Sequence, residues 1–418
     1  MAFNIKKIIV TLAISIYCIN IAAQDWHQWR GENRNNIIRN NSANLDWSEE
    51  KPRLAWIFRD AGAGYSSPAV VGTTLYMSGA DSCEFAFALD TETGKLIWKQ
   101  ELGERFVQEH GDGPRGTITV DDDRLYLIRP AGDIHCLSAI DGKIIWQRNL
   151  PEEFDGKIMS QWGYSESLLI DGNLMICTPG GENGTMAALD KYSGKTVWIA
   201  KDWTDEAAYS SPIVAEIEGV RQYIQQSAKG IAGVSAKDGK LLWRVEIEDY
   251  KVAVIPTPLY HENLIYATAG YNAGCTAIRI AKENETFKTE IVYANKFMSN
   301  YSSGVVLLDG YLYGFSETSG WMCQNFETGE NVWQLGRGGS KFGNGAMVAI
   351  NDRLLLSDAR GALLLIEASP KGWKEFGGFD IPERTTIENN DNLVLAHHVV
   401  ANGKLYVRDQ DLLFCFEL

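Results

Sequence analysis

The feature that most constrains the fold of this chain is a short segment that recurs along it. In the clearest copy, ALDTETGKLIWKQEL (residues 88–102), an apolar stretch reaches Asp90, turns through Gly94 and leaves as a second apolar stretch that carries Trp98. An Asp side chain can bond to the backbone two residues on, and glycine takes the positive φ that closes a short loop. The segment therefore predicts a β-hairpin.

Similar segments place a tryptophan at regular positions along the chain: Trp56, Trp98, Trp146, Trp198, Trp243, Trp333 and Trp373. Neighbouring positions are 40 to 52 residues apart, except for one gap of 90 residues that holds two periods. In that gap we expect Phe287 to take the place of the tryptophan. A repeat of this length with several strands per unit predicts a β-propeller, in which the tryptophans pack between blades.

The last copy of the repeat is split between the two ends of the chain. The segment KLYVRDQDLLFCFEL (404–418) reaches the first strand of the hairpin, and KPRLAWIFRD (51–60) supplies the missing strand. We therefore predict an all-β fold, an eight-bladed β-propeller of four-stranded antiparallel blades over residues 51–418, with the ring closed by an N-terminal strand that completes the last blade. Residues 24–50 form a lead-in segment, and the sequence leaves open whether it packs on the ring.

The repeat pattern [AC]-L-D-x-x-[TS]-G-K-x-x-W resembles that of the pyrroloquinoline quinone-like (PQQ-like) propellers, over residues 51–418. The segment DWHQWRG (25–31) is similar to the lead-in of secreted members of that family. The resemblance implies the propeller fold. It is less informative about function, because the family includes both quinone-dependent dehydrogenases and non-enzymatic propellers of the cell envelope.

Residues 1–23 have the pattern of a signal peptide. Lys6 and Lys7 precede an apolar run over residues 8–21, and Ala22 and Ala23 follow it. The run is short for a membrane span, and no other segment of the sequence is long enough. We predict export to the periplasm or the extracellular space after cleavage near Ala23, with a retained anchor as the alternative.

Charge and cysteine content exclude some classes of function. The formal net charge is −15, which disfavours binding to nucleic acid or to anionic lipid. The six cysteines after the signal form no C-x-x-C motif and no adjacent pair, which argues against metal clusters and redox pairs. Cys136, Cys323 and Cys415 occupy one position of the repeat, where a small apolar residue packs between blades. We expect a monomer without a metal.

Candidate site residues come from segments that depart from the repeat, because a single site in a ring must break its symmetry. These segments are EHGDGPRG (109–116), SQWGYSES (160–167), GSKFGNG (339–345) and AHHVV (396–400). They belong to links between blades, which share one face of a propeller with the loop between the second and third strands. The candidates for ligand binding at this mouth are His110, Asp112, Arg115, Trp162, Tyr164, Glu166, Lys341, Asn344 and His398.

Each candidate chemistry has a structural alternative. Arg115 and Lys341 could attract an anionic ligand, or be solvated rim charges. Trp162 could stack on a planar ligand, or simply pack. His397 and His398 point to opposite faces of a strand, which favours a core histidine over a metal ligand. The segment GDGPRG lacks the Lys-Ser/Thr of a phosphate loop. The repeated motifs at Tyr65, Tyr209 and Tyr301 favour a scaffold role for these three tyrosines.

Three hypotheses of function follow. The first is a secreted, non-catalytic propeller that binds a protein, peptide or glycan through its loop-rich face and needs no cofactor. The second, implied by the resemblance, is a dehydrogenase of alcohols or sugars that uses pyrroloquinoline quinone with calcium. Trp162 and Glu166 could then contact cofactor and cation, but the family's adjacent cysteine pair is missing. The third is a polysaccharide-active enzyme, in which Arg115, His110, Tyr164 and Lys341 neutralise a uronate and supply a base.

Overall fold

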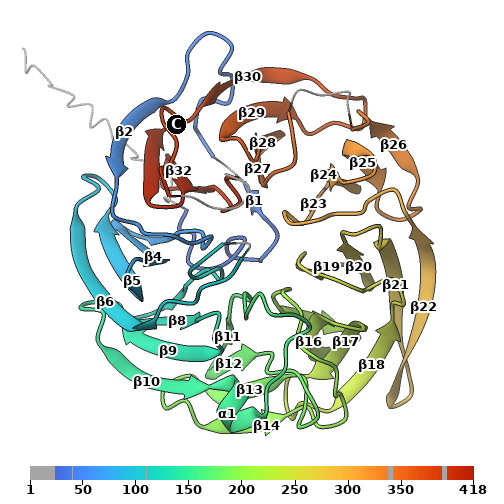
Figure 1. The fold of residues 1–418 in the computed structure, drawn as a ribbon. Coiled ribbons are helices and arrows are strands. Elements are labelled where there is room, and N and C mark those ends of the chain that lie inside the picture. Colours follow the sequence, from blue (N-terminus) through green and yellow to red (C-terminus); the bar gives the residue numbers. More distant parts are fainter. Residues whose placement is uncertain (1–23, 40, 110, 338–341, 388–392) are drawn as a thin grey trace, which may run out of the picture.

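Eight four-stranded blades, one of them extended by a fifth short strand, surround a central axis in the computed structural model, which describes residues 24–39, 41–109, 111–337, 342–387 and 393–418 (Figure 1). In the first blade the strands run outward from the axis in chain order and are antiparallel. They are β3 (Ala69–Val71), β4 (Thr74–Ala80), β5 (Cys83–Asp90) and β6 (Leu96–Glu104).

The next six blades repeat this order. The second blade consists of β7 (Thr119–Asp121), β8 (Arg124–Ile128), β9 (Asp133–Ser138) and β10 (Ile144–Asn149), and the third of β11 (Leu169–Asp171), β12 (Leu174–Cys177), β13 (Ala187–Asp190) and β14 (Thr196–Ile199). The fourth consists of β15 (Ile213–Ile217), β16 (Val220–Ser227), β17 (Gly230–Ser235) and β18 (Leu241–Glu246), and the fifth of β19 (Leu259–His261), β20 (Leu264–Ala269), β21 (Gly274–Glu283) and β22 (Thr286–Asn295). The sixth consists of β23 (Val306–Leu308), β24 (Tyr311–Ser316), β25 (Gly320–Asn325) and β26 (Asn331–Gln334), and the seventh of β27 (Met347–Ile350), β28 (Arg353–Ser357), β29 (Ala362–Glu367) and β30 (Glu375–Asp380). One short helix, α1 (Leu150–Phe154), follows β10.

The eighth blade closes the ring as the sequence predicts. It consists of β31 (Val399–Ala401), β32 (Lys404–Asp409), β33 (Leu412–Glu417) and, as its outermost strand, β2 (Arg53–Phe58). β2 runs antiparallel to β33 with Trp56 opposite Cys415. The predicted fold class, an all-β propeller of eight blades, is therefore confirmed.

The core lies between neighbouring blades, and strand alternation builds it. In β5, Phe85, Phe87 and Leu89 face the eighth blade, whereas Ala86 and Ala88 face the second blade. The sizes of these side chains vary between blades, since in β29 large residues face both neighbours: Leu363 and Leu365 face the eighth blade, and Leu364 and Ile366 face the sixth. Full burial of each large side chain contributes about 1.5–3 kcal/mol, so the ring is held mainly by sheet-on-sheet packing.

In five blades the repeat tryptophan ties the outer strand to the turn of the next blade, whereas Trp243 and Trp373 donate to Gln222 and Glu375 of their own blades. The indole N–H of Trp98 donates to the carbonyl of Ala139, in the turn between β9 and β10, at 3.1 Å. The Trp98 ring also lies against Gly142 of that turn, where a Cβ atom would sit 2.5 Å from it. Four other tryptophans make the same bond: Trp56 to Thr91, Trp146 to Lys191, Trp198 to Ala236 and Trp333 to Ser369.

The fifth blade departs from this pattern, and the expectation for Phe287 is wrong. Tyr293, not Phe287, stands opposite Ala277 at the repeat position, and its hydroxyl donates to the Phe326 carbonyl at 2.7 Å. Phe287 lies opposite Lys282, near the end of an extended hairpin formed by β21 and β22. The longer hairpin shifts the aromatic residue six positions along the sequence.

The lead-in segment packs inside the ring. Residues 24–38, which we call the plug, enter the central channel and contain β1 (Ile37–Ile38), which pairs in parallel with β27 (Figure 1). The plug makes a hydrogen bond to every blade. Its partners, in blade order, are Val70, Val120, Leu168, Pro212, Thr257, Val305, Ala349 and Asn402. One segment therefore joins all eight blades at their inner ends.

Two buried arginines supply many of these bonds. Arg34 donates to the carbonyls of Ser167 at 3.0 Å, Pro212 at 2.7 Å and Leu168, and Arg30 donates to the Val305 carbonyl. Burial lowers the pKa of Arg34 to about 9 and that of Arg30 to about 10, so both stay charged at neutral pH. Buried carbonyls without a strand partner need such donors.

No helix in the described part of the chain is long and apolar enough to cross a membrane. The described cysteines are free thiols, and Cys136, Cys323 and Cys415 are buried opposite Trp146, Trp333 and Trp56.

Candidate functional site

A pocket of about 480 Å³ opens on the face that carries the links between blades. Six aromatic residues line it, together with four serines, four aliphatic residues, one arginine and one histidine. They are Trp29, Tyr65, Trp162, Tyr209, Tyr271 and Tyr301; Ser165, Ser167, Ser211 and Ser302; Val252, Ile255, Leu393 and Leu395; and Arg115 and His397. We call it the funnel pocket. None of these residues lies in a strand.

The plug supplies the side of the pocket that faces the channel. Trp29 projects from the plug, and its indole N–H donates to the Thr257 hydroxyl at 2.8 Å. Its ring lies 4.5 Å from the ring of His397, centroid to centroid. Burial lowers the pKa of His397 to about 3, so this imidazole is neutral at physiological pH. The pocket is therefore closed toward the channel by an aromatic pair.

Paired aromatic rings form the walls. The rings of Trp162 and Tyr209 are 5.8 Å apart at 31°, and those of Tyr271 and Tyr301 are 5.5 Å apart at 62°. Burial raises the pKa of Tyr209 to about 12, so its phenol is uncharged. The walls therefore offer flat apolar surface edged by neutral hydroxyl groups.

Arg115 is the charged residue among the described residues of the lining. Its guanidinium donates to the carbonyls of Gly113 at 2.8 Å and Gly111 at 2.7 Å, and lies 5.8 Å from the centre of the Tyr65 ring. Burial lowers the pKa of Arg115 from its ordinary value. The two carbonyls hold the guanidinium in place without neutralising it.

The structure brings some of the predicted site residues together at this mouth. Arg115 and Trp162 line the pocket. Asn344 lies at its margin, where its amide donates to the Ser302 hydroxyl at 3.3 Å. Asp112 instead fixes its own link, since it pairs with Arg105 at 2.5 Å. His110 and Lys341 lie outside the described residues.

Three predicted residues, Tyr164, Glu166 and His398, lie in the core rather than at the mouth. The Tyr164 hydroxyl donates to the Pro179 carbonyl at 2.8 Å. The His398 ring lies between the Ser357 hydroxyl, at 2.9 Å, and the Leu355 carbonyl, at 3.1 Å. The reason is alternation in extended backbone: Ser165, Ser167 and His397 face the pocket, so their neighbours face inward.

Several lining residues were not among the sequence-based candidates. Tyr65, Tyr209 and Tyr301, expected to be scaffold, line the pocket. A signal was present, because the repeated Y-S-S motif places a tyrosine at the same point of three links. Trp29 gave no such signal, since its position depends on how the plug enters the channel.

The buried carboxyl of Glu166 predicts a pH effect on stability. It accepts bonds from the amide and hydroxyl of Thr178, each at 2.7 Å, and burial raises its pKa from 4.5 to about 7. Folding therefore favours the protonated form, and this contribution is lost as pH rises from about 4.5 through 7. We expect Glu166→Gln to gain stability relative to the parent protein over that range, in urea unfolding at several pH values. A constant difference would contradict the assignment.

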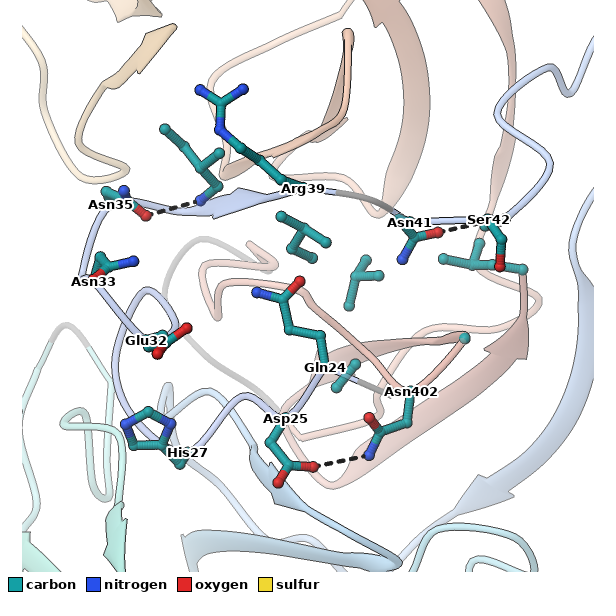
Figure 2. A pocket seen from close by; sticks show the side chains of 17 residues that line it. Gln24, Asp25, His27, Glu32, Asn33, Asn35, Arg39, Asn41, Ser42 and Asn402 are labelled. Carbon is teal, nitrogen blue, oxygen red and sulfur yellow. Dashed lines mark hydrogen bonds between the residues drawn. The ribbon is translucent and has the colours of Figure 1, made fainter. Parts of the chain in front are cut away.

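A second cavity, of about 950 Å³, lies on the opposite face. It is lined by the two ends of the plug, residues 24–27 and 32–38, which we call its arms, and by the turn between β31 and β32. Figure 2 shows Gln24 extending between the two arms, and Asp25 bonded to the Asn402 amide at 3.2 Å. Asn33, Asn35 and further polar side chains of the plug also line it. The plug therefore separates two concave surfaces.

The described residues offer little to a metal ion. No group of three His, Cys, Asp or Glu side chains in this part of the protein is arranged to hold one. Among the described residues, the lining of the funnel pocket contains no Asp or Glu.

Comparison with known proteins identifies the family. The sequence model described as "Outer membrane protein assembly factor BamB" matches residues 86–335, more than half of the chain. The chain belongs to this family of PQQ-like propellers. It is 24% identical over 242 residues to the outer membrane protein assembly factor BamB of Yersinia pestis, covering 55% of this chain and 58% of that one. It is 26% identical over 236 residues to the tetrathionate hydrolase of Acidithiobacillus ferrooxidans, covering 52% and 44%. The chain thus spans about half the length of these relatives.

Solved structures agree on the fold. BamB from Moraxella catarrhalis superposes with a TM-score of 0.60 at 16% identity, covering 84% of this chain and 94% of that one. The quinohemoprotein alcohol dehydrogenase from Comamonas testosteroni superposes with a TM-score of 0.65 at 11% identity, covering 94% and 80%. Identities this low show a shared propeller and nothing about shared chemistry.

Proposed function

We propose that this protein is a non-catalytic binding propeller, exported to the cell envelope, which takes a peptide or glycan in the funnel pocket. The observation that carries the proposal is the pocket itself, a cavity of about 480 Å³ with six aromatic residues in its lining. Aromatic side chains supply large, rigid contact area and dominate the energy of many binding sites.

The lining supports binding better than catalysis. A general acid or base works best with a pKa near the working pH. His397 and Tyr209 have pKa values of about 3 and about 12, and no carboxyl group is among the described residues that line the pocket. The described lining therefore lacks the proton-transfer group that the polysaccharide-active hypothesis requires.

The family supports a role in the envelope. One relative is named as an assembly factor for outer membrane proteins. By analogy, the exposed loops around the funnel pocket would dock an envelope protein or glycan, with residues 1–23 as the export signal.

The quinone hypothesis is not supported by the lining of this pocket. The family's dehydrogenases would need residues that hold quinone and calcium, and calcium takes six to eight oxygen ligands, many from carboxylates. The described lining offers serine, tyrosine and backbone oxygens without a carboxylate. We therefore derive no redox step for this chain.

Trp162→Ala tests the proposal. We expect it to weaken, by about tenfold or more, the binding of ligands that the parent protein captures from glycan and peptide arrays, because it removes one wall of the pocket. The matched control is Tyr192→Ala, which removes an exposed aromatic residue from the turn between β13 and β14, on the opposite face. Equal binding by both variants, with unchanged melting temperatures, would place the binding site elsewhere.

A further inference from the structure

Arg115 is a partly buried cation whose charge has no partner in the described part of the protein. The two acidic groups whose charge reaches it, Glu84 and Asp112, pair with other arginines, Arg129 at 2.8 Å and Arg105 at 2.5 Å. A guanidinium carries five N–H donors, and the carbonyls of Gly111 and Gly113 use two of them. The remaining donors are available on a side chain that lines the pocket.

The surroundings make this charge effective. His397 and Tyr209 are neutral at physiological pH, and the described residues of the lining include no carboxyl group. The described lining therefore carries one positive charge, that of Arg115, within a protein whose net charge is −15. A ligand seated between the aromatic walls would displace water from around Arg115, which strengthens a charge-assisted hydrogen bond to a single anionic group. The negative surface of the protein disfavours a long polyanion.

We infer that the funnel pocket binds a saccharide that carries one carboxylate, such as a uronate unit, and that Arg115 holds the carboxylate. This inference rests on the proposed function and names its ligand class. The flat aromatic rings match the apolar faces of sugar rings. The hydroxyls of Ser165, Ser211 and Tyr209 match sugar hydroxyls as donors and acceptors.

A peptide fits these features less well. Extended peptides are often bound by addition to an exposed sheet edge, where main-chain bonds give the affinity. Every residue of the lining lies outside the strands, so the pocket offers no such edge. Recognition here depends on side-chain rings, hydroxyls and one cation.

Calorimetry with two matched probes tests the inference. The probes are a trisaccharide with one glucuronate unit and the methyl ester of the same trisaccharide. We expect the acid to bind about tenfold more tightly than the ester, because a charge-assisted bond is lost in the ester. Arg115→Gln should remove this preference, by weakening the binding of the acid much more than that of the ester. Lys157→Gln, which removes an exposed cation from another link on the same face, should keep the preference.

Arg115→Lys separates the loss of the charge from a change in the structure of the link that carries residue 115. It keeps the positive charge as long as that link stays folded. It should retain part of the preference for the acid, with a melting temperature close to that of the parent protein. Equal affinity for acid and ester, or a preference that survives in Arg115→Gln, would overturn the role of Arg115 and leave the funnel pocket as a binding site. Binding of an acidic peptide alone would overturn the saccharide. Binding of no ligand by the parent protein would overturn the proposed function as well.

Discussion

Replacing Arg34 by alanine lowers the free energy of unfolding by about 3–5 kcal/mol, because it leaves the buried carbonyls of Ser167 and Pro212 without a donor and leaves that of Leu168 with the Thr119 hydroxyl alone. The side chain is buried, and it donates to Ser167, Leu168 and Pro212, in the segments that lead into β11 and β15. The loss of one residue of the plug thus loosens the inner ends of two neighbouring blades. Urea unfolding followed by tryptophan fluorescence measures the effect.

Arg39→Ala is the matched control for this prediction. Arg39 follows the plug directly, but its side chain is exposed at the margin of the second cavity. Its replacement should change the free energy of unfolding by no more than about 0.5 kcal/mol. If Arg34→Ala and Arg39→Ala have the same small effect, the plug does not stabilise the ring.

Gly142→Ala destabilises the protein by about 2–4 kcal/mol, from two sources. Gly142 has a φ of 74°, which costs a residue with a Cβ about 1–2 kcal/mol. The added Cβ would also lie 2.5 Å from the Trp98 ring, which must then move and strain its bond to the Ala139 carbonyl. Thermal and urea unfolding both report the change.

Gly172→Ala separates these two sources. Gly172 lies in the turn between β11 and β12 with a φ of 58°, and a Cβ there would meet no atom within 4 Å. This variant should lose only the backbone contribution, about 1 kcal/mol. The difference between the variants measures the contact between tryptophan and turn that joins neighbouring blades. Equal losses would show that this joint contributes nothing.

Local sequence was sufficient to predict the ring. The tryptophan and the turn glycine recur along the sequence and can be recognised in single copies of the repeat. The last copy is split between the two ends of the chain, which predicted that the ring closes by pairing those ends. The signal failed in the fifth blade, where a longer hairpin moved the aromatic position from Phe287 to Tyr293. Hairpin length is set by residues that the repeat does not constrain.

The site was less predictable because it depends on which way side chains face. The sequence indicated the links that carry Arg115 and Trp162, but alternation sends Tyr164, Glu166 and His398 into the core. One residue of register separates the two outcomes. The position of Trp29 could not be predicted from the local sequence, because hydrogen bonds to all eight blades position the plug that carries it.

Hydrogen–deuterium exchange with a captured ligand tests most directly whether the link face is the binding face. We predict slower exchange on binding in the links that line the funnel pocket, residues 160–167, 209–211 and 300–303, and unchanged exchange around Asn402 and the arms of the plug that line the second cavity. Protection confined to the second cavity, with none in these links, would contradict the proposed function.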